Sequence, residues 1–233
     1  MDWRDYWNGH HPRFANQRHK VLHYRALASE FLALIKERFA DDKPVVLDYG
    51  CGESLDADLV AARCARLYLA DTAPTVVELV RRRFAADSNI TAMSAEDVAG
   101  MRGGSVDLIV VNSVVQYLSR PELDALLELW RSKLSQRGWL VLADIIPPTV
   151  GPLTDTRALL EFAARGGFLI AASGSLVRTN LSGYRKLCAT LGITRYSEEQ
   201  MLRVLHEANF NAQRRLPNLG HNPARLCFAA RWR

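Results

Sequence analysis

The sequence predicts an α/β fold built on a parallel sheet, and three features indicate it. Short apolar runs rich in β-branched residues alternate with longer segments of helical periodicity. One run, residues 45–49, breaks directly into the turn Gly50-Cys51-Gly52. A second run, residues 67–70, ends in Asp71, 21 residues after Gly50. Glycines let a ligand approach the backbone, and a carboxylate at this offset suits both hydroxyls of a ribose, so the pattern predicts a nucleoside-containing ligand at the carboxyl edge of the sheet.

The composition is that of an ordinary globular protein. The 233 residues are 48% hydrophobic and 24% charged, which suits one α/β domain with added segments. No apolar run reaches the roughly 18 residues that span a bilayer, and the first residues lack the apolar stretch of a signal peptide. Four cysteines without metal-like spacing are expected to be reduced thiols of a cytoplasmic protein. The net charge of +5 permits an anionic partner but does not demand nucleic acid.

Two common nucleotide motifs do not fit the glycine turn. A dinucleotide fingerprint would need a third glycine where the chain has Leu55, which would keep the following helix away from a pyrophosphate. The phosphate-binding pattern that ends in Gly-Lys-Ser or Gly-Lys-Thr is absent from the sequence.

The remaining pattern, an acid followed by G-x-G, resembles the first motif of the class I S-adenosylmethionine-dependent methyltransferases. Ser54 stands where that family often has a third glycine. The resemblance implies a Rossmann-like sheet of seven strands in the order 3-2-1-4-5-7-6, with strand 7 antiparallel and helices on both faces. It implies an enzyme that uses S-adenosyl-L-methionine to methylate a small molecule. Residues 1–233 would form one domain, with an N-terminal helical cap over 1–40 and a lid insertion over 145–196.

The first half of the chain supplies four strands. A helix is expected over about 16–39, where apolar residues recur every three or four positions. A crossover helix is expected over 54–64, and Pro74 suits the first turn of the next helix, with Thr72 as a candidate N-cap. Residues 89–93 and 106–113 are the third and fourth strands.

The resemblance places the cofactor at the ends of these strands. In the family an acid after the third strand commonly binds the adenine amine, but this chain has Ser94, so the contact would pass to Glu96, Asp97 or the backbone. Gln116 stands where relatives often have a histidine. The predicted cofactor-binding residues are Asp48, Tyr49, Gly50, Cys51, Gly52, Asp71, Thr72, Ser94, Ala95, Glu96, Asn112 and Ser113.

The second half departs from regular alternation. A helix over 121–134 and a turn at Arg137-Gly138 precede the fifth strand, 139–144. Residues 145–196 are too long for a plain connection, so they are interpreted as a helical lid, a thickening of the core or a homodimer contact. Ser197 with Gln200 predicts a capped helix. Strands over 210–216 and 224–232 follow, and their joining loop, 217–223, would lie on the ligand side.

Methyl transfer from a sulfonium needs a base only if the acceptor is a hydroxyl or a protonated amine. Histidine has a suitable pKa, and the candidates are His221, His11 and His23. The predicted substrate-binding residues are Tyr117, Asp144, Phe168 and Tyr184, and no metal is expected. The apolar insertion favours a small hydrophobic or aromatic acceptor. The basic N-terminal segment would also allow an acceptor that is anionic or lipid-like. Two alternatives are a nucleic-acid methyltransferase and a non-catalytic S-adenosylmethionine-binding regulatory or scaffold protein.

Overall fold

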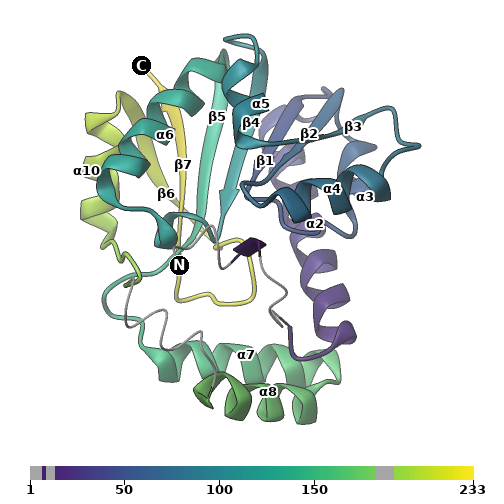
Figure 1. Cartoon of the computed structure of the whole chain (residues 1–233). Coiled ribbons are helices and arrows are strands. Elements are labelled where there is room, and N and C mark those ends of the chain that lie inside the picture. The colour runs from purple at the N-terminus through teal and green to yellow at the C-terminus, as the bar shows by residue number, and fades with distance from the viewer. Residues whose placement is uncertain (1–6, 9–13, 182–191) are drawn as a thin grey trace.

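The computed structural model describes residues 7–8, 14–181 and 192–233. Seven strands form one sheet in the order β3-β2-β1-β4-β5-β7-β6, as Figure 1 shows. Strands β1 to β5 pair in parallel, and β7 is antiparallel to both β5 and β6. The predicted strand order and the antiparallel seventh strand are therefore confirmed. The strands are β1 Val45–Tyr49, β2 Arg66–Ala70, β3 Ile90–Met93, β4 Val106–Asn112, β5 Leu134–Ile145, β6 Phe210–Arg215 and β7 Leu226–Trp232.

Helices cover both faces of the sheet. The first face is packed by α2 Gln17–Phe39, α3 Ala57–Ala61 and α4 Pro74–Arg83. The second face is packed by α5 Ala95–Gly100, α6 Arg120–Lys133 and α10 Glu198–Glu207. A short 3-10 helix, η1 Val115–Tyr117, follows β4. Helices α7 Pro152–Gly166 and α8 Leu169–Leu181 follow β5 and run across the lower end of the molecule in Figure 1, beyond the carboxyl ends of the parallel strands.

The central strands are mainly apolar because both of their faces are covered. On β1, Val46 faces the α2 side and Leu47 faces the α6 side, and both are fully buried. The period of two along a strand sends neighbouring side chains to opposite faces. Trp130 of α6 is also fully buried and meets the ring of Tyr49 edge to face at 5.3 Å between centroids. This double core fixes the position of the glycine turn that ends β1.

The expected N-cap of α4 is wrong. Thr72 is exposed, and the N-cap position falls on Ala73, which has no capping side chain. The carboxylate of Asp71 satisfies a backbone amide at the start of α4 instead, because its Oδ1 accepts from the Ala73 amide at 2.9 Å. An aspartate can satisfy the amide two residues ahead, so a threonine cap is not needed.

The expected turn before the fifth strand is also wrong. Strand β5 already begins at Leu134 and runs through Arg137 and Gly138. The register between β4 and β5 shifts between Val106 and Leu108, so the extra residues form an irregularity within the strand rather than a separate turn. The capped start of α10 is confirmed, since Ser197 and Gln200 form a reciprocal capping box.

Replacing Leu34 by alanine is expected to destabilise the protein by about 2–5 kcal/mol, because this fully buried α2 side chain would leave a cavity against the sheet. Chemical denaturation of the purified variant measures the change. Leu79→Ala on α4 is the matched control, since Leu79 is 40% exposed and its loss should change the free energy of unfolding by less than about 1 kcal/mol. Equal losses in the two variants would contradict the packing of α2 described above.

Candidate functional site

The turn after β1 requires glycine at two positions. Gly50 and Gly52 have φ angles of +83° and +58°, which side chains rarely tolerate. A Cβ atom at Gly50 would lie 2.2 Å from a methyl group of Val114, and one at Gly52 would lie 2.7 Å from the hydroxyl of Tyr24. The backbone at this turn is therefore in close contact with both η1 and α2. No alanine fits without movement of these neighbours.

Asp71 joins the end of β2 to this turn. Its Oδ2 accepts from the amide of Gly52 at 3.1 Å, and its Oδ1 accepts from the amide of Ala73 at 2.9 Å. The Asp71 amide in turn donates to Met93 at the end of β3. Each carboxylate oxygen has a second lone pair, so Asp71 can accept further hydrogen bonds from a ligand. The structure thus brings Asp71 to the glycine turn, as the spacing predicted.

A pocket of about 480 Å³, partly open to solvent, lies beside the turn. Four of the sequence-predicted cofactor residues line it: Asp48, Gly50, Cys51 and Asn112. Burial and the neighbouring Asp71 raise the pKa of Asp48 to about 7, and the Ser54 hydroxyl opposes this rise. The Oδ1 atom of Asn112 is buried and has no hydrogen-bond partner in the described part of the chain. These oxygens suit the positively charged methionine end of S-adenosylmethionine.

Helix α2 forms one wall of this pocket and is fastened to the turn. Tyr24 Oη accepts from the amide of Glu53 at 2.9 Å, and Lys20 pairs with the Glu53 carboxylate at 2.5 Å. Arg25 forms two bonds to Asp56, both at 2.9 Å. Leu27, Ala28 and Phe31 complete this wall. Tyr24 was not predicted as a site residue because it belongs to the apolar stripe of α2. The available signal in the sequence was its hydroxyl group, which is a polar group within that stripe.

Other predicted cofactor residues lie around the turn without lining the pocket. The ring of Tyr49 packs on Trp130, so only the Tyr49 backbone faces the turn. Ser94 caps α5, because its hydroxyl accepts from the Asp97 amide while the Asp97 carboxylate accepts from the Ser94 amide. Ala95 and Glu96 form the first turn of α5, next to the end of β3. The assignment of these residues and of Thr72 and Ser113 to the cofactor stays a prediction.

The three segments expected to shape the acceptor side meet in a cluster of rings. His23 of α2 faces His221 of the 217–223 loop, with 6.4 Å between ring centroids. His221 stacks on Phe162 of α7 at 5.3 Å, and His19 stacks on Phe168 at 4.7 Å. Phe168 is itself buried in this cluster. His11 and Tyr184 lie outside the described residues.

These histidines are held in the neutral form. Burial, reinforced by repulsion from His221, lowers the pKa of His19 to about 4. Burial, with repulsion from His221 and His19, lowers the pKa of His23 to about 3. Burial also lowers the pKa of His221, although Asp144 acts in the opposite direction. The cluster therefore carries little positive charge at neutral pH.

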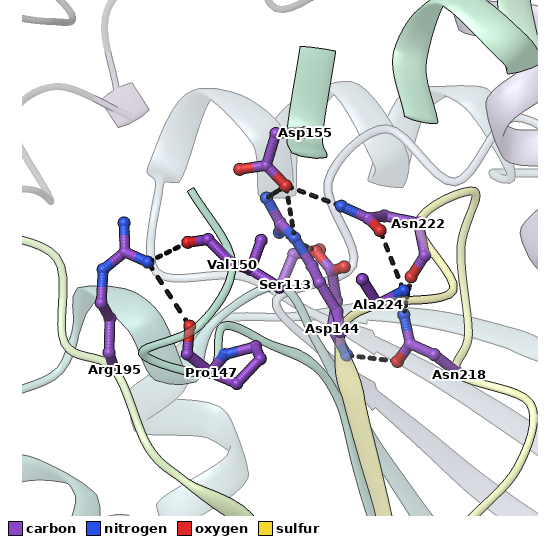
Figure 2. Close-up of polar contacts among 10 residues, drawn as sticks. Ser113, Asp144, Pro147, Val150, Asp155, Arg195, Asn218, Asn222 and Ala224 are labelled. Carbon is purple, nitrogen blue, oxygen red and sulfur yellow. Dashed lines mark hydrogen bonds and ion pairs between the residues drawn. The ribbon is translucent and has the colours of Figure 1, made fainter. Parts of the chain in front are cut away.

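A polar network occupies the ends of β4 and β5, as Figure 2 shows. Ser113 donates to Asp144 Oδ2 at 2.5 Å, and Arg225 of the β6–β7 connection donates to the same oxygen at 2.7 Å. Arg225 also pairs with Asp155 of α7 at 3.1 Å. Ser113 and Asp144 both have φ near +60°, which costs roughly 1–2 kcal/mol each in a residue with a side chain. Backbone strain of this kind persists where surrounding contacts enforce it, often at functional sites.

Two asparagines hold the loop that carries His221. Asn218 Oδ1 accepts from the amide of Asp144 at 2.9 Å, and its amide group donates to the carbonyl of Asn222 at 3.2 Å. Asn222 donates to Asp155 at 2.6 Å (Figure 2). The loop thus lies on the ligand side, as expected, but sequence reasoning missed its anchors and Arg225. The available signal in the sequence was the pair Asn218 and Asn222, which flank Gly220-His221 and could anchor the loop.

Residues 7–8 contact elements at the carboxyl edge of the sheet. Trp7 meets Tyr117 of η1 edge to face at 5.2 Å between centroids. The Thr75 amide at the start of α4 donates to the Asn8 side chain at 3.3 Å. Residues 7–8 therefore contact elements on both sides of the β1–β4 junction.

Metal-binding clusters and membrane-spanning helices are both absent from the described residues. No group of three or more His, Cys, Asp or Glu side chains in residues 7–8, 14–181 and 192–233 is arranged to hold a metal ion. Within the same residues, no helix is both long enough and apolar enough to span a membrane.

Comparison with known proteins adds independent findings. A family model described as a methyltransferase domain matches residues 47–142, from β1 to β5. A search of curated proteins finds no significant match. Magnesium protoporphyrin IX methyltransferase from Synechocystis PCC 6803, with bound SAH, is 19% identical with a TM-score of 0.60, over 99% of this chain and 93% of that one.

Two further solved structures share the fold. SAM-bound CalS10, an amino pentose methyltransferase from Micromonospora echinaspora, is 15% identical with a TM-score of 0.61, over 96% of this chain and 100% of that one. The mitomycin 7-O-methyltransferase MmcR is 14% identical with a TM-score of 0.59, over 89% of this chain and 53% of that one.

Acidification is expected to destabilise the protein through the histidine cluster. The folded-state pKa values of His19 and His23 lie below the unfolded value of 6.5, so their contribution is fully present above pH 6.5 and is lost as the pH falls toward 4. Denaturation curves between pH 7 and 4 measure this loss. His23→Gln should flatten the curve by up to about 1.4 kcal/mol per pH unit. His206→Gln, which changes an exposed histidine of α10, is the control, and equal slopes in the wild type and His23→Gln would contradict the expectation.

Proposed function

Because a methyltransferase-domain model matches residues 47–142, we propose that the chain is a class I, S-adenosylmethionine-dependent methyltransferase that methylates an oxygen or nitrogen atom of a small hydrophobic or aromatic molecule. The observation that carries the proposal is the glycine turn fastened to Asp71, with the unpaired Asn112 oxygen beside it. A ribose and a charged methionine end are the two parts of the cofactor that such groups recognise. The acceptor class rests on the apolar and aromatic segments that surround the strand ends.

The cofactor would lie along the carboxyl ends of β2, β1 and β4. Asp71 would accept from the ribose hydroxyls, and the first turn of α5 would flank the adenine. The Gly50–Gly52 backbone, Asp48 and Asn112 would surround the methionine end. Each neighbouring strand is displaced by about 4.8 Å, so the ends of β4 and β5 lie within about 10 Å of Gly50. Ser113, Tyr117 and Asp144, at and after the ends of β4 and β5, would then be left to meet the acceptor.

The reaction is an in-line displacement. A lone pair on the acceptor atom forms the new bond to the methyl carbon, and the electron pair of the broken carbon–sulfur bond returns to sulfur. Because the sulfonium already activates the methyl group, the main task of the protein is alignment, which can supply up to about 7–11 kcal/mol of barrier reduction. The acceptor atom finally loses its proton to a base or to water.

His221 is the best-placed base among the predicted histidines. Its loop is anchored at Asn218 and Asn222, and the charges of Asp144 and Asp155 favour its protonated form. His23 faces it, but its lower pKa of about 3 makes His23 a weak base. We therefore assign the proton to His221 and a shaping role to His23.

The cap and the insertion would enclose the reacting atoms. Residues 7–8 contact α4 and η1, and α7 is tied to α2 through the Arg18 Nε–Gly166 carbonyl bond of 2.5 Å. Exclusion of water strengthens electrostatic interactions at the reacting centre and prevents side reactions. This supports a lid function for residues 145–196 and a cap function for residues 1–40.

Asp71→Ala is expected to weaken S-adenosylmethionine binding at least about tenfold, because a ribose partner and two backbone anchors are lost together. Titration calorimetry measures the dissociation constant, and circular dichroism checks the fold. Asp87→Ala is the matched control, since Asp87 also accepts from a backbone amide two residues ahead but has no bond to the glycine turn in the described part of the chain. If the wild type shows no heat with S-adenosylmethionine or its demethylated product, the proposed function fails.

Cofactor affinity is expected to rise with pH. The pKa of Asp48 is raised to about 7, so below that pH the carboxyl is mainly neutral and attracts the cofactor ammonium weakly. Binding should therefore tighten between pH 5.5 and 7.5 and release protons below pH 7. Calorimetry in buffers of different ionisation enthalpy counts those protons. In an Asp48→Asn variant, cofactor affinity should no longer depend on pH. If the affinity of the wild type did not change with pH, Asp48 would not be a contact of the methionine end.

A further inference from the structure

Gln116 carries a buried oxygen that lacks a hydrogen-bond donor. Only 6% of the residue is exposed, and its Oε1 atom has no partner in the described part of the chain. Leaving a buried amide oxygen unpaired costs free energy, so such atoms are uncommon in folded proteins and call for a specific explanation, such as a functional role. None of the interactions assigned to the cofactor above uses this atom.

The backbone holds Gln116 at the acceptor side. The Gln116 carbonyl accepts from the Thr194 amide at 2.9 Å, and the carbonyl of Leu118 accepts from the Thr194 hydroxyl at 2.8 Å. Two residues further on, the Tyr196 amide donates to the carbonyl of Ile146, just past the end of β5. Residues 194–196 therefore clamp η1 to the end of β5.

The neighbouring charges favour a donor rather than an anion. Burial alone would lower the pKa of Arg225, but Asp144, Asp155 and Tyr117 raise it. The Arg225 guanidinium lies between the Asp144 and Asp155 carboxylates. A second guanidinium, that of Arg195, is bonded to the carbonyls of Pro147 and Val150 (Figure 2). Among the described residues, the bonds to these carboxylates fall on Asp144 Oδ2 and Asp155 Oδ1, which leaves the other oxygen of each with acceptor capacity.

The histidine cluster adds little positive charge to this network. His19, His23 and His221 are all held neutral by burial at pH 7. A carboxylate or phosphate acceptor would therefore meet the spare oxygens of Gln116, Asp144 and Asp155, while both guanidinium groups are already bonded to protein oxygens. Like charges in a desolvated site repel each other, so they discriminate strongly between ligands.

We propose that Gln116 selects an acceptor that presents a neutral hydrogen-bond donor, a hydroxyl or an amine, and rejects a carboxylate at the position of methyl transfer. This inference rests on the proposed function and specifies the substrate class of the same site. The acceptor hydroxyl or neutral amine donates to Gln116 Oε1 while its lone pair forms the bond to the methyl carbon. The carbon–sulfur electron pair returns to sulfur, and the proton then passes from the methylated atom to His221 or to water. A site built to bind such a donor discriminates far better than an apolar pocket of the same shape.

The test uses the full chain, methyl-labelled S-adenosylmethionine and three probes with one ring system: 2-naphthol, 2-naphthylamine and 2-naphthoate. Label is expected to enter the naphthol or the naphthylamine at least about tenfold faster than the naphthoate. Gln116→Leu, which has a similar size without the amide, should lower kcat/KM for the labelled probe at least about tenfold. Gln116→Glu keeps an acceptor oxygen and should retain more activity than the leucine variant. Gln213→Leu, which changes an exposed glutamine of β6, is the control.

Two further measurements separate the possible outcomes. Calorimetry should give Gln116→Leu the same dissociation constant for S-adenosylmethionine as the wild type, within about twofold, because the cofactor lies elsewhere. Thermal unfolding of the free variant should occur at a higher temperature, since an apolar side chain replaces an unpaired oxygen. Faster labelling of the naphthoate, unchanged transfer by Gln116→Leu, or cofactor binding without labelling of any probe would overturn the substrate class. Absence of cofactor binding by the wild type would instead overturn the proposed function.

Discussion

The hydrogen bond from the Gly52 amide to Asp71 is the constraint on which the site depends. It requires β1 and β2 to end side by side, and it requires a left-handed backbone that glycine adopts at little cost. The buried core behind β1 fixes the first condition, because Val46 and Leu47 are held on opposite faces by α2 and α6. Tyr24 closes the turn from outside through the Glu53 amide. Packing thus positions the backbone amides that a nucleoside cofactor needs.

Much of the fold could be predicted from the sequence because its signals are local. The run at residues 45–49 followed by two glycines, and the later acid at Asp71, identify the first two strands and their ligand edge. The strand order came from resemblance to a family, and the structure confirms it. Errors were confined to element ends, where contacts distant in sequence decide: Asp71 satisfies the amide that Thr72 was expected to cap, and pairing with β4 extends β5 back to Leu134.

The acceptor side was harder to predict because it is assembled from distant segments. Arg225 lies 81 positions after Asp144 and 70 positions after Asp155 in the sequence. No periodic pattern in the sequence indicates contacts between residues so far apart. The same holds for Asn218, whose partner lies 74 positions earlier. Histidine positions were visible in the sequence, but their burial was not, and burial decides whether an imidazole is charged. Residue type alone therefore could not rank the candidate histidines.

The location of Arg225 has a consequence for how the site can vary. The described residues that line the pocket beside the glycine turn all fall between Tyr24 and Asn112. The polar network at the ends of β4 and β5 depends instead on Asn218, Asn222 and Arg225, which all come after β6. The residues proposed to hold the methyl donor are thus separate along the chain from those proposed to meet the acceptor. Substitutions in the late segments can therefore change the choice of acceptor while the pocket beside the turn keeps its lining.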